Sequence, residues 1–388
     1  MGAHLKLPVP GGGLEPYLPR GGTPYPSSSA PATSRKVYAA AHVVADPAAD
    51  TSPGGPQALD WETTLAFRHR LWDLGLGVAE AMDTAQRGMG LDWPLAAELV
   101  RRAGAEARAR GASLVAGAQT DHLPAGATPG LREVTEAYLY QCEVVEDAGA
   151  QVVLMASREL CRAARGPDDY AQVYGEVLRQ LRRPAVLHWL GDMFDPALRG
   201  YWGSASFAEA ADCLLGVIAD NVTMVEGVKC SLLDQHKEVD LRRRLPPGVR
   251  MYTGDDFDYP TTMAGDGEHH SDALLGAFDF AAPAAAWALQ ALDQGSTAEF
   301  TRRLAPTLPL SRHVFSTPTY YYKTGVVFLA YLGGAQDHFR MVGGLESGRS
   351  VTHLAQCYRL ADQAGLLPDL ELAAARMQLV LSLGGMAG

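Results

Sequence analysis

Residues 221–231 read NVTMVEGVKCS, a run of mostly apolar and β-branched residues that carries Lys229 near its end. This composition predicts a buried strand over Val222–Lys229. A lysine at the end of a buried strand can extend to the surface, form an ion pair, or remain shielded from water. Only the third setting lowers the lysine pKa and leaves a free amine that can attack a carbonyl group.

The chain outward from this run alternates between short apolar runs and amphipathic stretches with 3.6-residue periodicity. Eight strands that alternate with helices predict a (β/α)8 TIM barrel, in the α/β class. No G-x-G-x-x-G follows the first strand, which argues against an open, doubly wound sheet. The predicted strands are Val37–Val44, Leu76–Ala81, Ser113–Ala118, Gln151–Ala156, Ala185–Trp189, Val222–Lys229, Val249–Thr253 and Ala273–Phe280.

Composition divides the chain into three predicted parts. Residues 1–35 are rich in Gly, Pro and Ser and predict an irregular N-terminal extension. Residues 36–294 hold the strand and helix alternation of the barrel. The strand pattern then stops, and residues 295–388 predict a C-terminal helical region.

Charge and cysteine content exclude several functions. The net charge of -11 leaves no basic excess for nucleic acid or an anionic membrane, and no apolar run is long enough to span a bilayer. The N-terminus lacks the apolar region of a secretion signal. Five scattered cysteines without a CxxC pair predict reduced thiols of a cytoplasmic protein, with neither disulfides nor a zinc site. No glycine-rich nucleotide cradle is present, so we expect no NAD, ATP or other cofactor.

Polar side chains follow the predicted strands, and the C-terminal ends of the strands are where a TIM barrel has its active site. Some of them will cap helices instead, as Asp and Thr often do. Arg158 and Arg199 could bind a carboxylate or phosphate through their guanidinium groups. The candidate residues are Lys229 and His188 for catalysis, and His42, Asp83, Thr84, Gln119, Arg158, Arg199, Gly254, Asp255 and Asp256 for substrate binding.

The run V-E-G-V-K-C-S, the helix predicted after it and Y-T-G-D-D at residues 252–256 resemble the core of the dihydrodipicolinate synthase and N-acetylneuraminate lyase superfamily. In that family a G-[IV]-K-x-S strand end carries the lysine that forms a Schiff base. The similarity covers roughly Val37 to Gly333. The resemblance implies a class I aldolase or lyase of carbohydrate metabolism that acts on a keto acid or keto sugar, and a homodimer or homotetramer.

Two family motifs are missing from this sequence. The family's G-T-T-G-E, which recognises a pyruvate-type carboxylate, is replaced by M-D-T-A-Q at residues 82–86. The family's Y-N-x-P is replaced by L-H-W-L-G at residues 187–191, so that His188 stands in the place of the proton-transferring tyrosine. An imidazole with a pKa near 6.5 could transfer a proton at neutral pH.

Two other functions stay open on the sequence alone. A divalent cation held by strand-end side chains would make a metal-dependent sugar isomerase or aldolase, which EDTA should inactivate. The ligands in that case would be His42, Glu80, Asp83, His188 and Asp255. The loss of two family motifs is also compatible with a barrel that binds sugars without catalysis.

Overall fold

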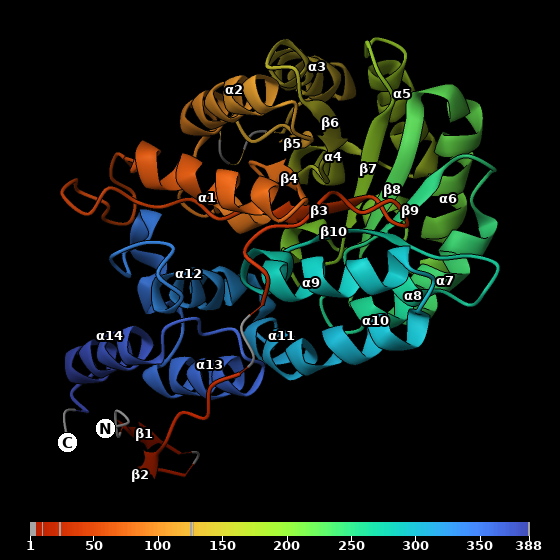
Figure 1. Cartoon of the computed structure of the whole chain (residues 1–388). Helices are drawn as coiled ribbons and strands as arrows, with labels where there is room; N and C mark the ends of the chain where they lie inside the picture. The colour runs from red at the N-terminus through yellow and green to blue at the C-terminus, as the bar shows by residue number, and fades with distance from the viewer. Residues whose placement is uncertain (1–4, 10, 23–24, 125, 127, 387–388) are drawn as a thin grey trace. The chain divides into compact units, whose positions relative to one another are not determined.

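Eight short parallel strands close into a barrel in the computed structural model of the chain (Figure 1). The structure describes residues 5–9, 11–22, 25–124, 126 and 128–386. Each strand pairs with the next one in the chain, and the last strand pairs with the first. The strands are β3 (Val37–Ala40), β4 (Gly77–Glu80), β5 (Leu114–Ala118), β6 (Gln151–Leu154), β7 (Ala185–Leu190), β8 (Val225–Ser231), β9 (Arg250–Thr253) and β10 (Asp272–Leu275).

The interior of the barrel is apolar along most of its length. Buried side chains from seven of its strands form one cluster, which includes Val186 of β7. Val186 is the register partner of Gly227 in β8, and two residues further along His188 is the partner of Lys229. Because side chains on one face of a strand recur every second residue, His188 and Lys229 also point into the barrel, closer to its C-terminal end.

The chain forms two compact units, which we call the barrel unit and the helical unit. The barrel unit comprises residues 35–41 and 77–276, and therefore holds all eight strands. Local signals set its helices, as in the second helix, where Asp92 caps the start and Gly111 ends it in a left-handed conformation. Its helices are α2 (Trp93–Arg110), α3 (Leu131–Asp147), α4 (Arg158–Ala163), α5 (Pro167–Leu178), α6 (Phe207–Asp220), α7 (Gln235–Arg244) and α8 (Tyr259–Ala264).

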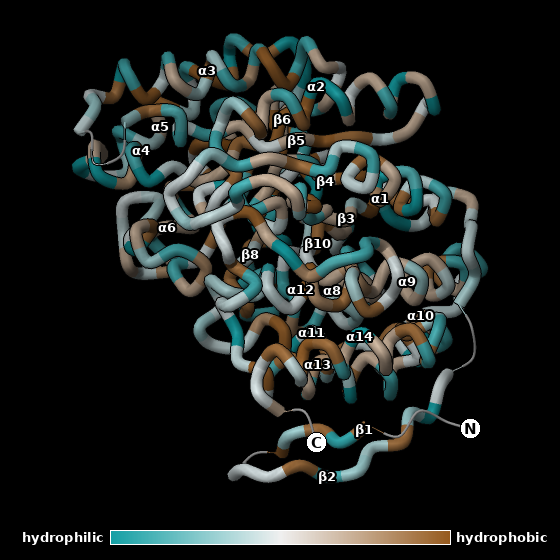
Figure 2. Tube along the Cα trace, turned by 90° about the vertical axis from the view of Figure 1, so that its left-hand side faces the viewer, coloured by the Kyte–Doolittle hydropathy of each residue, from teal (hydrophilic) through white to brown (hydrophobic). Residues whose placement is uncertain are grey.

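The helical unit comprises residues 1–34, 42–76 and 277–388. Its helices are α1 (Trp61–Asp73), α9 (Phe278–Asp293), α10 (Thr297–Leu304), α11 (Leu308–Val314), α12 (Tyr322–Leu332), α13 (Val351–Gln363) and α14 (Leu370–Leu383). An antiparallel pair of strands, β1 (Leu5–Pro8) and β2 (Leu14–Tyr17), lies beside α13 (Figure 2).

One buried side chain of α13 binds the segment around residues 17–21. Asp362 of α13 accepts a hydrogen bond of 2.7 Å from the hydroxyl of Tyr17. It also accepts hydrogen bonds of 3.0 Å from the backbone N–H groups of Arg20 and Gly21. The Gly- and Pro-rich start of the chain is thus attached to α13 by hydrogen bonds to one carboxyl group.

The structure confirms the predicted TIM barrel and corrects several predicted boundaries. The first strand ends at Ala40, four residues before the predicted end at Val44. Residues Val222–Met224 form a turn of 3-10 helix, and β8 begins only at Val225. Residues 1–35 were predicted to be irregular, whereas Leu5–Pro8 and Leu14–Tyr17 pair as two short antiparallel strands.

The largest correction concerns the eighth strand. We predicted it over Ala273–Phe280, whereas β10 ends at Leu275 and α9 begins at Phe278. The residues that follow are mostly alanine, which has the highest helix propensity, so the apolar run divides into a short strand and a helix. The predicted division of the chain at residues 35 and 294 stays a prediction. No helix among the described residues is long and apolar enough to cross a membrane.

Candidate active site

Lys229 lies near the C-terminal end of β8 and is 7% exposed. Burial lowers its pKa, while the nearby carboxylates of Asp83 and Asp256 act in the opposite direction. Lys229 Nζ forms no hydrogen bond or ion pair with the described residues of the chain. The amine is therefore enclosed without being neutralised by a direct partner, which is the setting that a Schiff-base lysine needs.

Gly254, directly after β9, makes room for this lysine. Its backbone N–H donates to Cys230 O at 2.8 Å, which draws the β9 end against β8. A Cβ atom at Gly254 would collide with the hydroxyl of Ser231 and would lie 3.1 Å from Cε of Lys229. Only glycine fits this close approach of the two strand ends, so the predicted importance of Gly254 has a steric basis.

His188 lies beside Lys229 in the barrel register and is fully buried. Its Nε2 is 3.1 Å from the hydroxyl of Ser231, and its buried Nδ1 has no hydrogen-bond partner among the described residues. Burial lowers the pKa of His188 well below its usual value, and the positive charge of Lys229 lowers it further. The imidazole is accordingly neutral at pH 7, able to accept a proton and connected to a hydroxyl that can relay one.

Two predicted binding residues, Asp83 and Thr84, follow the end of β4. Asp83 and Thr84 lie in a turn of 3-10 helix, η1 (Asp83–Ala85), just after β4. Thr84 is buried, and Oδ2 of Asp83 is buried with no hydrogen-bond partner among the described residues. The charge of Asp83 acts on Lys229, so the two side chains belong to one electrostatic group.

The end of β9 adds two further acids. Asp256 is buried and its charge acts on Lys229. Asp255 accepts a hydrogen bond of 2.9 Å from the N–H of Phe257, and burial raises its pKa to about 6. Oδ2 of Asp255 is buried without a partner among the residues that the structure describes. A carboxyl group with this pKa can hold or release a proton near neutral pH.

Glu238 of α7 supports the same strand end. Its carboxylate accepts hydrogen bonds of 2.8 Å from Thr253 and 2.7 Å from Ser271. Burial nevertheless raises the pKa of Glu238 to about 7. The folded chain therefore keeps a proton that the unfolded chain releases near pH 4.5. This group's contribution to the free energy of unfolding is complete below about pH 4.5 and is lost as the pH rises through about 7.

Replacing Glu238 with glutamine should remove the loss of stability that this group causes as the pH rises. Between about pH 5 and about pH 8, the free energy of unfolding of Glu238→Gln should increase relative to that of the wild type. Urea unfolding at several pH values measures the difference. Glu98→Gln, at a half-exposed position of α2, is the matched control and should follow the wild type. Parallel pH profiles for the wild type and Glu238→Gln would show that Glu238 is ionised in the folded chain.

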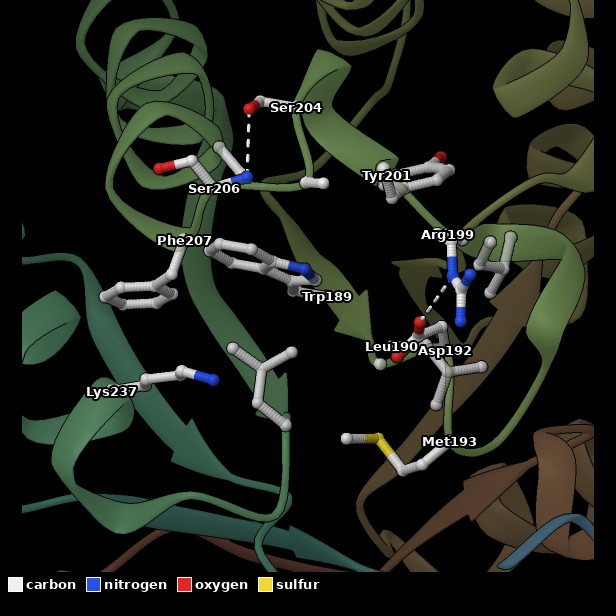
Figure 3. Close-up of a pocket in the computed structure, with 16 residues that line it drawn as sticks. Trp189, Leu190, Asp192, Met193, Arg199, Tyr201, Ser204, Ser206, Phe207 and Lys237 are labelled. Atoms are coloured by element: carbon white, nitrogen blue, oxygen red, sulfur yellow. Dashed lines mark hydrogen bonds and ion pairs between the residues drawn. The ribbon is translucent and has the colours of Figure 1, made fainter.

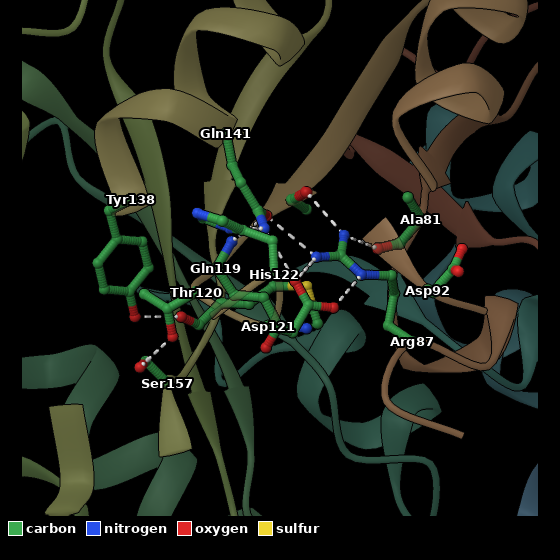
Figure 4. A network of polar contacts seen from close by, with 12 residues as sticks. Ala81, Arg87, Asp92, Gln119, Thr120, Asp121, His122, Tyr138, Gln141 and Ser157 are labelled. Atoms are coloured by element: carbon green, nitrogen blue, oxygen red, sulfur yellow. Dashed lines mark hydrogen bonds and ion pairs between the residues drawn. The ribbon is translucent and has the colours of Figure 1, made fainter. Parts of the chain in front are cut away.

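A polar network fixes the ends of β4 and β5 (Figure 4). The guanidinium of Arg87 donates to both oxygens of Asp121, to the carbonyl of Ala81 and to Oε1 of Gln141. Gln119, a predicted binding residue, donates its backbone N–H to the same Oε1 at 2.9 Å. Because Arg87 is tied to the turn that precedes Asp83, the network holds that acid in position.

The two arginines predicted to bind anions are both paired with acids. Nε of Arg158 lies 2.5 Å from Asp195, and Nε of Arg199 lies 3.4 Å from Asp192. Arg199 lines a pocket of about 400 Å³ beside the ends of β7 and β8. Figure 3 shows Arg199 and Lys237 on opposite sides of this pocket, with Trp189 between them. The longer distance of its ion pair leaves Arg199 the better placed of the two for a ligand.

His42 belongs to the helical unit, as does its partner Asp279. Nδ1 of His42 lies 2.7 Å from Asp279, and Nε2 lies 3.1 Å from Gln336. Asp279, which we assigned to the eighth strand, lies in the first turn of α9. Both ring nitrogens of His42 are engaged, so the structure gives no support to the metal alternative that needs His42 as a ligand.

Three residues of the candidate site, Ser231, Glu238 and Gln141, were not predicted from the sequence. Ser231 could have been found, because it closes the G-V-K-C-S run that we compared with the family motif. Glu238 and Gln141 gave no signal, since each reads as an ordinary polar residue of an amphipathic helix. Their roles depend on side chains that are close in space and distant in sequence.

Solved structures of dihydrodipicolinate synthase share this fold. The enzyme from Thermotoga maritima has a TM-score of 0.63 and 15% identity, and covers 86% of this chain and 99% of its own. The enzyme from Aquifex aeolicus gives a TM-score of 0.63, 13% identity and the same coverage. The enzyme from Bacillus clausii gives 0.60 and 14%, with 84% of this chain and 97% of its own covered.

The molecule is thus a TIM barrel of the dihydrodipicolinate synthase fold, and the resemblance predicted from the sequence is confirmed for the fold. Within that class, the chain belongs to the family described as "Protein of unknown function (DUF993)", whose model matches residues 5–386. No curated protein matches the chain.

Proposed function

We propose that the chain is a class I aldolase or lyase in which Lys229 forms a Schiff base with a keto sugar or keto acid. The observation that supports this most directly is the enclosure of Lys229 in the barrel with a lowered pKa and no direct partner among the described residues. A buried amine that served no purpose would cost stability without compensation. The fold shared with dihydrodipicolinate synthases agrees with a lyase.

The reaction begins when the free amine of Lys229 attacks the substrate carbonyl. Loss of water gives a positively charged iminium, which accepts the electron pair of the carbon–carbon bond that breaks and becomes an enamine. The hydroxyl on the leaving fragment gives up its proton and becomes a carbonyl. A proton then returns to the enamine carbon, and water releases the product from Lys229. Bond formation follows the same steps in reverse.

We assign the proton transfers to His188 and Ser231. His188 starts neutral and can accept the proton of the substrate hydroxyl, either directly or through Ser231, which lies 3.1 Å from its Nε2. The iminium places a positive charge beside His188 until bond cleavage converts it into a neutral enamine. The imidazolium formed in that step can then return its proton to the enamine carbon.

The acids around Lys229 favour a keto sugar over a 2-keto acid. Asp83 and Asp256 both act on the lysine, so a substrate carboxylate next to the carbonyl would be repelled. Sugar hydroxyls, in contrast, can donate to the unpartnered oxygens of Asp83 and Asp255. Arg199 can bind a carboxylate or phosphate group in the pocket that it lines, since a guanidinium recognises both.

Borohydride trapping tests the proposal. The protein is incubated with pyruvate, with neutral keto sugars and with phosphorylated keto sugars, then reduced and digested for peptide mass analysis. The chain has five lysines, Lys6, Lys36, Lys229, Lys237 and Lys323, so the modified residue is identified directly. We expect a substrate-dependent adduct on Lys229 alone, with keto sugars giving more than pyruvate. Absence of an adduct with every carbonyl compound, together with no turnover, would favour a barrel that only binds.

A further inference from the structure

Helices α11 and α13 bring together three side chains that can bind a metal ion. The two helices lie side by side (Figures 1 and 2). His353 and Cys357 are four residues apart on α13, so one helical turn places them on the same face. His313 of α11 completes the group, and one ligand atom from each residue lies within 4.8 Å of the others.

The hydrogen bonds of this group leave metal-binding atoms available. Nε2 of His313 lies 3.0 Å from the backbone carbonyl of His353. A carbonyl only accepts, so Nε2 must carry the proton, and Nδ1 of the neutral ring keeps a free lone pair. A bond from the second ring nitrogen to a carbonyl is the arrangement that orients metal-binding histidines. Nε2 of His353 is buried and has no hydrogen-bond partner among the described residues.

A metal ion binds neutral imidazoles and a thiolate. Burial lowers the pKa of His353 to about 3, and also lowers that of His313. Burial raises the pKa of the Cys357 thiol to about 12, although the nearby charge of Arg349 acts in the opposite direction. The thiolate is the form of cysteine that binds metal, so metal binding should release close to one proton.

We propose that His313, His353 and Cys357 form a binding site for a transition-metal ion of the zinc class, separate from the reaction assigned to Lys229. Two imidazoles and one thiolate suit Zn²⁺, and a water molecule can fill the fourth position of a tetrahedral site. Bound zinc ligands lie roughly 3.5 Å apart, so small side-chain rotations must close the group around the ion. His313 and His353 are half-buried, which gives an ion access.

Arg349 places a positive charge beside the three proposed ligands. Its guanidinium donates to the carbonyls of Ser316 at 2.7 Å and Pro318 at 2.9 Å, which fixes it in place. That charge opposes a divalent cation but favours the thiolate form of Cys357. Among the three proposed ligands the thiolate alone is anionic, so loss of Cys357 should weaken binding most.

Metal titration of the full chain, stripped with a chelator and kept reduced, tests this proposal. We expect one Zn²⁺ bound per chain by calorimetry, with close to one proton released when buffers of different ionisation enthalpy are compared. Co²⁺ should give a thiolate charge-transfer absorption band. His353→Gln and Cys357→Ser should each weaken Zn²⁺ binding by at least about tenfold, and Cys357→Ser should abolish the cobalt band.

The control is the double variant His269→Gln/His270→Gln, which removes an exposed pair of histidines from another part of the chain. It should bind Zn²⁺ as tightly as the wild type. Circular dichroism establishes that each variant is folded, and His313→Gln provides a third ligand variant at a half-buried position. Equal Zn²⁺ affinity in the wild type and the folded ligand variants, or no stoichiometric binding by the wild type, would overturn the proposal.

Discussion

Replacing Lys229 with methionine should lower the rate of carbon–carbon bond cleavage by at least about a thousandfold, because it removes the amine that forms the iminium. Methionine retains the length and the apolar surface of the lysine side chain but cannot be charged. Since burial of Lys229 already lowers its pKa, removal of the amine should leave the free energy of unfolding unchanged or raise it. Steady-state kinetics on the trapped substrate and urea unfolding measure the two effects.

A large loss of rate without a loss of stability distinguishes a catalytic lysine from a structural one. If Lys229 were instead retained for an ion pair, its replacement would lower the free energy of unfolding and have little effect on turnover. Lys6→Met is the control, because Lys6 is exposed on β1. The variant should match the wild type in rate and in adduct formation. Turnover by Lys229→Met at more than about a tenth of the wild-type rate would show that the reaction does not pass through this amine.

Replacing Gly254 with alanine should reduce turnover by about a hundredfold, because the added methyl group meets Ser231 and Lys229, to which we assign the reaction. The new Cβ would collide with Ser231 and lie 3.1 Å from Cε of Lys229. Relief of this contact must shift the lysine or separate the ends of β8 and β9, and a displacement of about 1 Å can cost that much in rate. Stability should also fall by about 1–3 kcal/mol, as expected for overpacking.

Gly216→Ala supplies the matched control for the same chemical change. Gly216 lies within α6, and nothing lies within 4 Å of the position that its Cβ would occupy. The added methyl should therefore stabilise the helix by about 0.5–1 kcal/mol and leave the rate unchanged. Wild-type kinetics in the folded Gly254→Ala variant would show that this approach of the strands does not position Lys229.

The barrel could be predicted because its strands are short apolar runs bounded by amphipathic helices. The ends of those runs were predicted less well where local propensity decided the outcome. Ala273–Phe280 looked like one apolar strand, but its alanine-rich continuation is a better helix, so Asp279 was assigned to the wrong element. Val222–Met224 has β-branched residues and still forms a 3-10 turn, because packing sets where β8 begins.

The candidate site likewise contains residues that could be predicted from the sequence and residues that could not. Lys229 could be found because its signal is local, a lysine in an apolar run. The placement of Asp83 and Asp256 beside it depends on the closure of the barrel, which brings β4 and β9 to the same end as β8. The hydrogen bond between His188 and Ser231 crosses 43 residues of sequence, and the Asp362 contacts cross more than 340. Sequence patterns carry little information about such pairs.

The attachment of Tyr17 to Asp362 bears on how the protein is made. The two residues are 345 positions apart, so the ribosome must add 345 residues after Tyr17 before this hydrogen bond can form. The barrel unit, whose last residue is Gly276, can fold while translation continues. The N-terminal segment must wait in an unattached form until α13 emerges. The segment around Tyr17 therefore becomes attached only after the barrel unit has been synthesised.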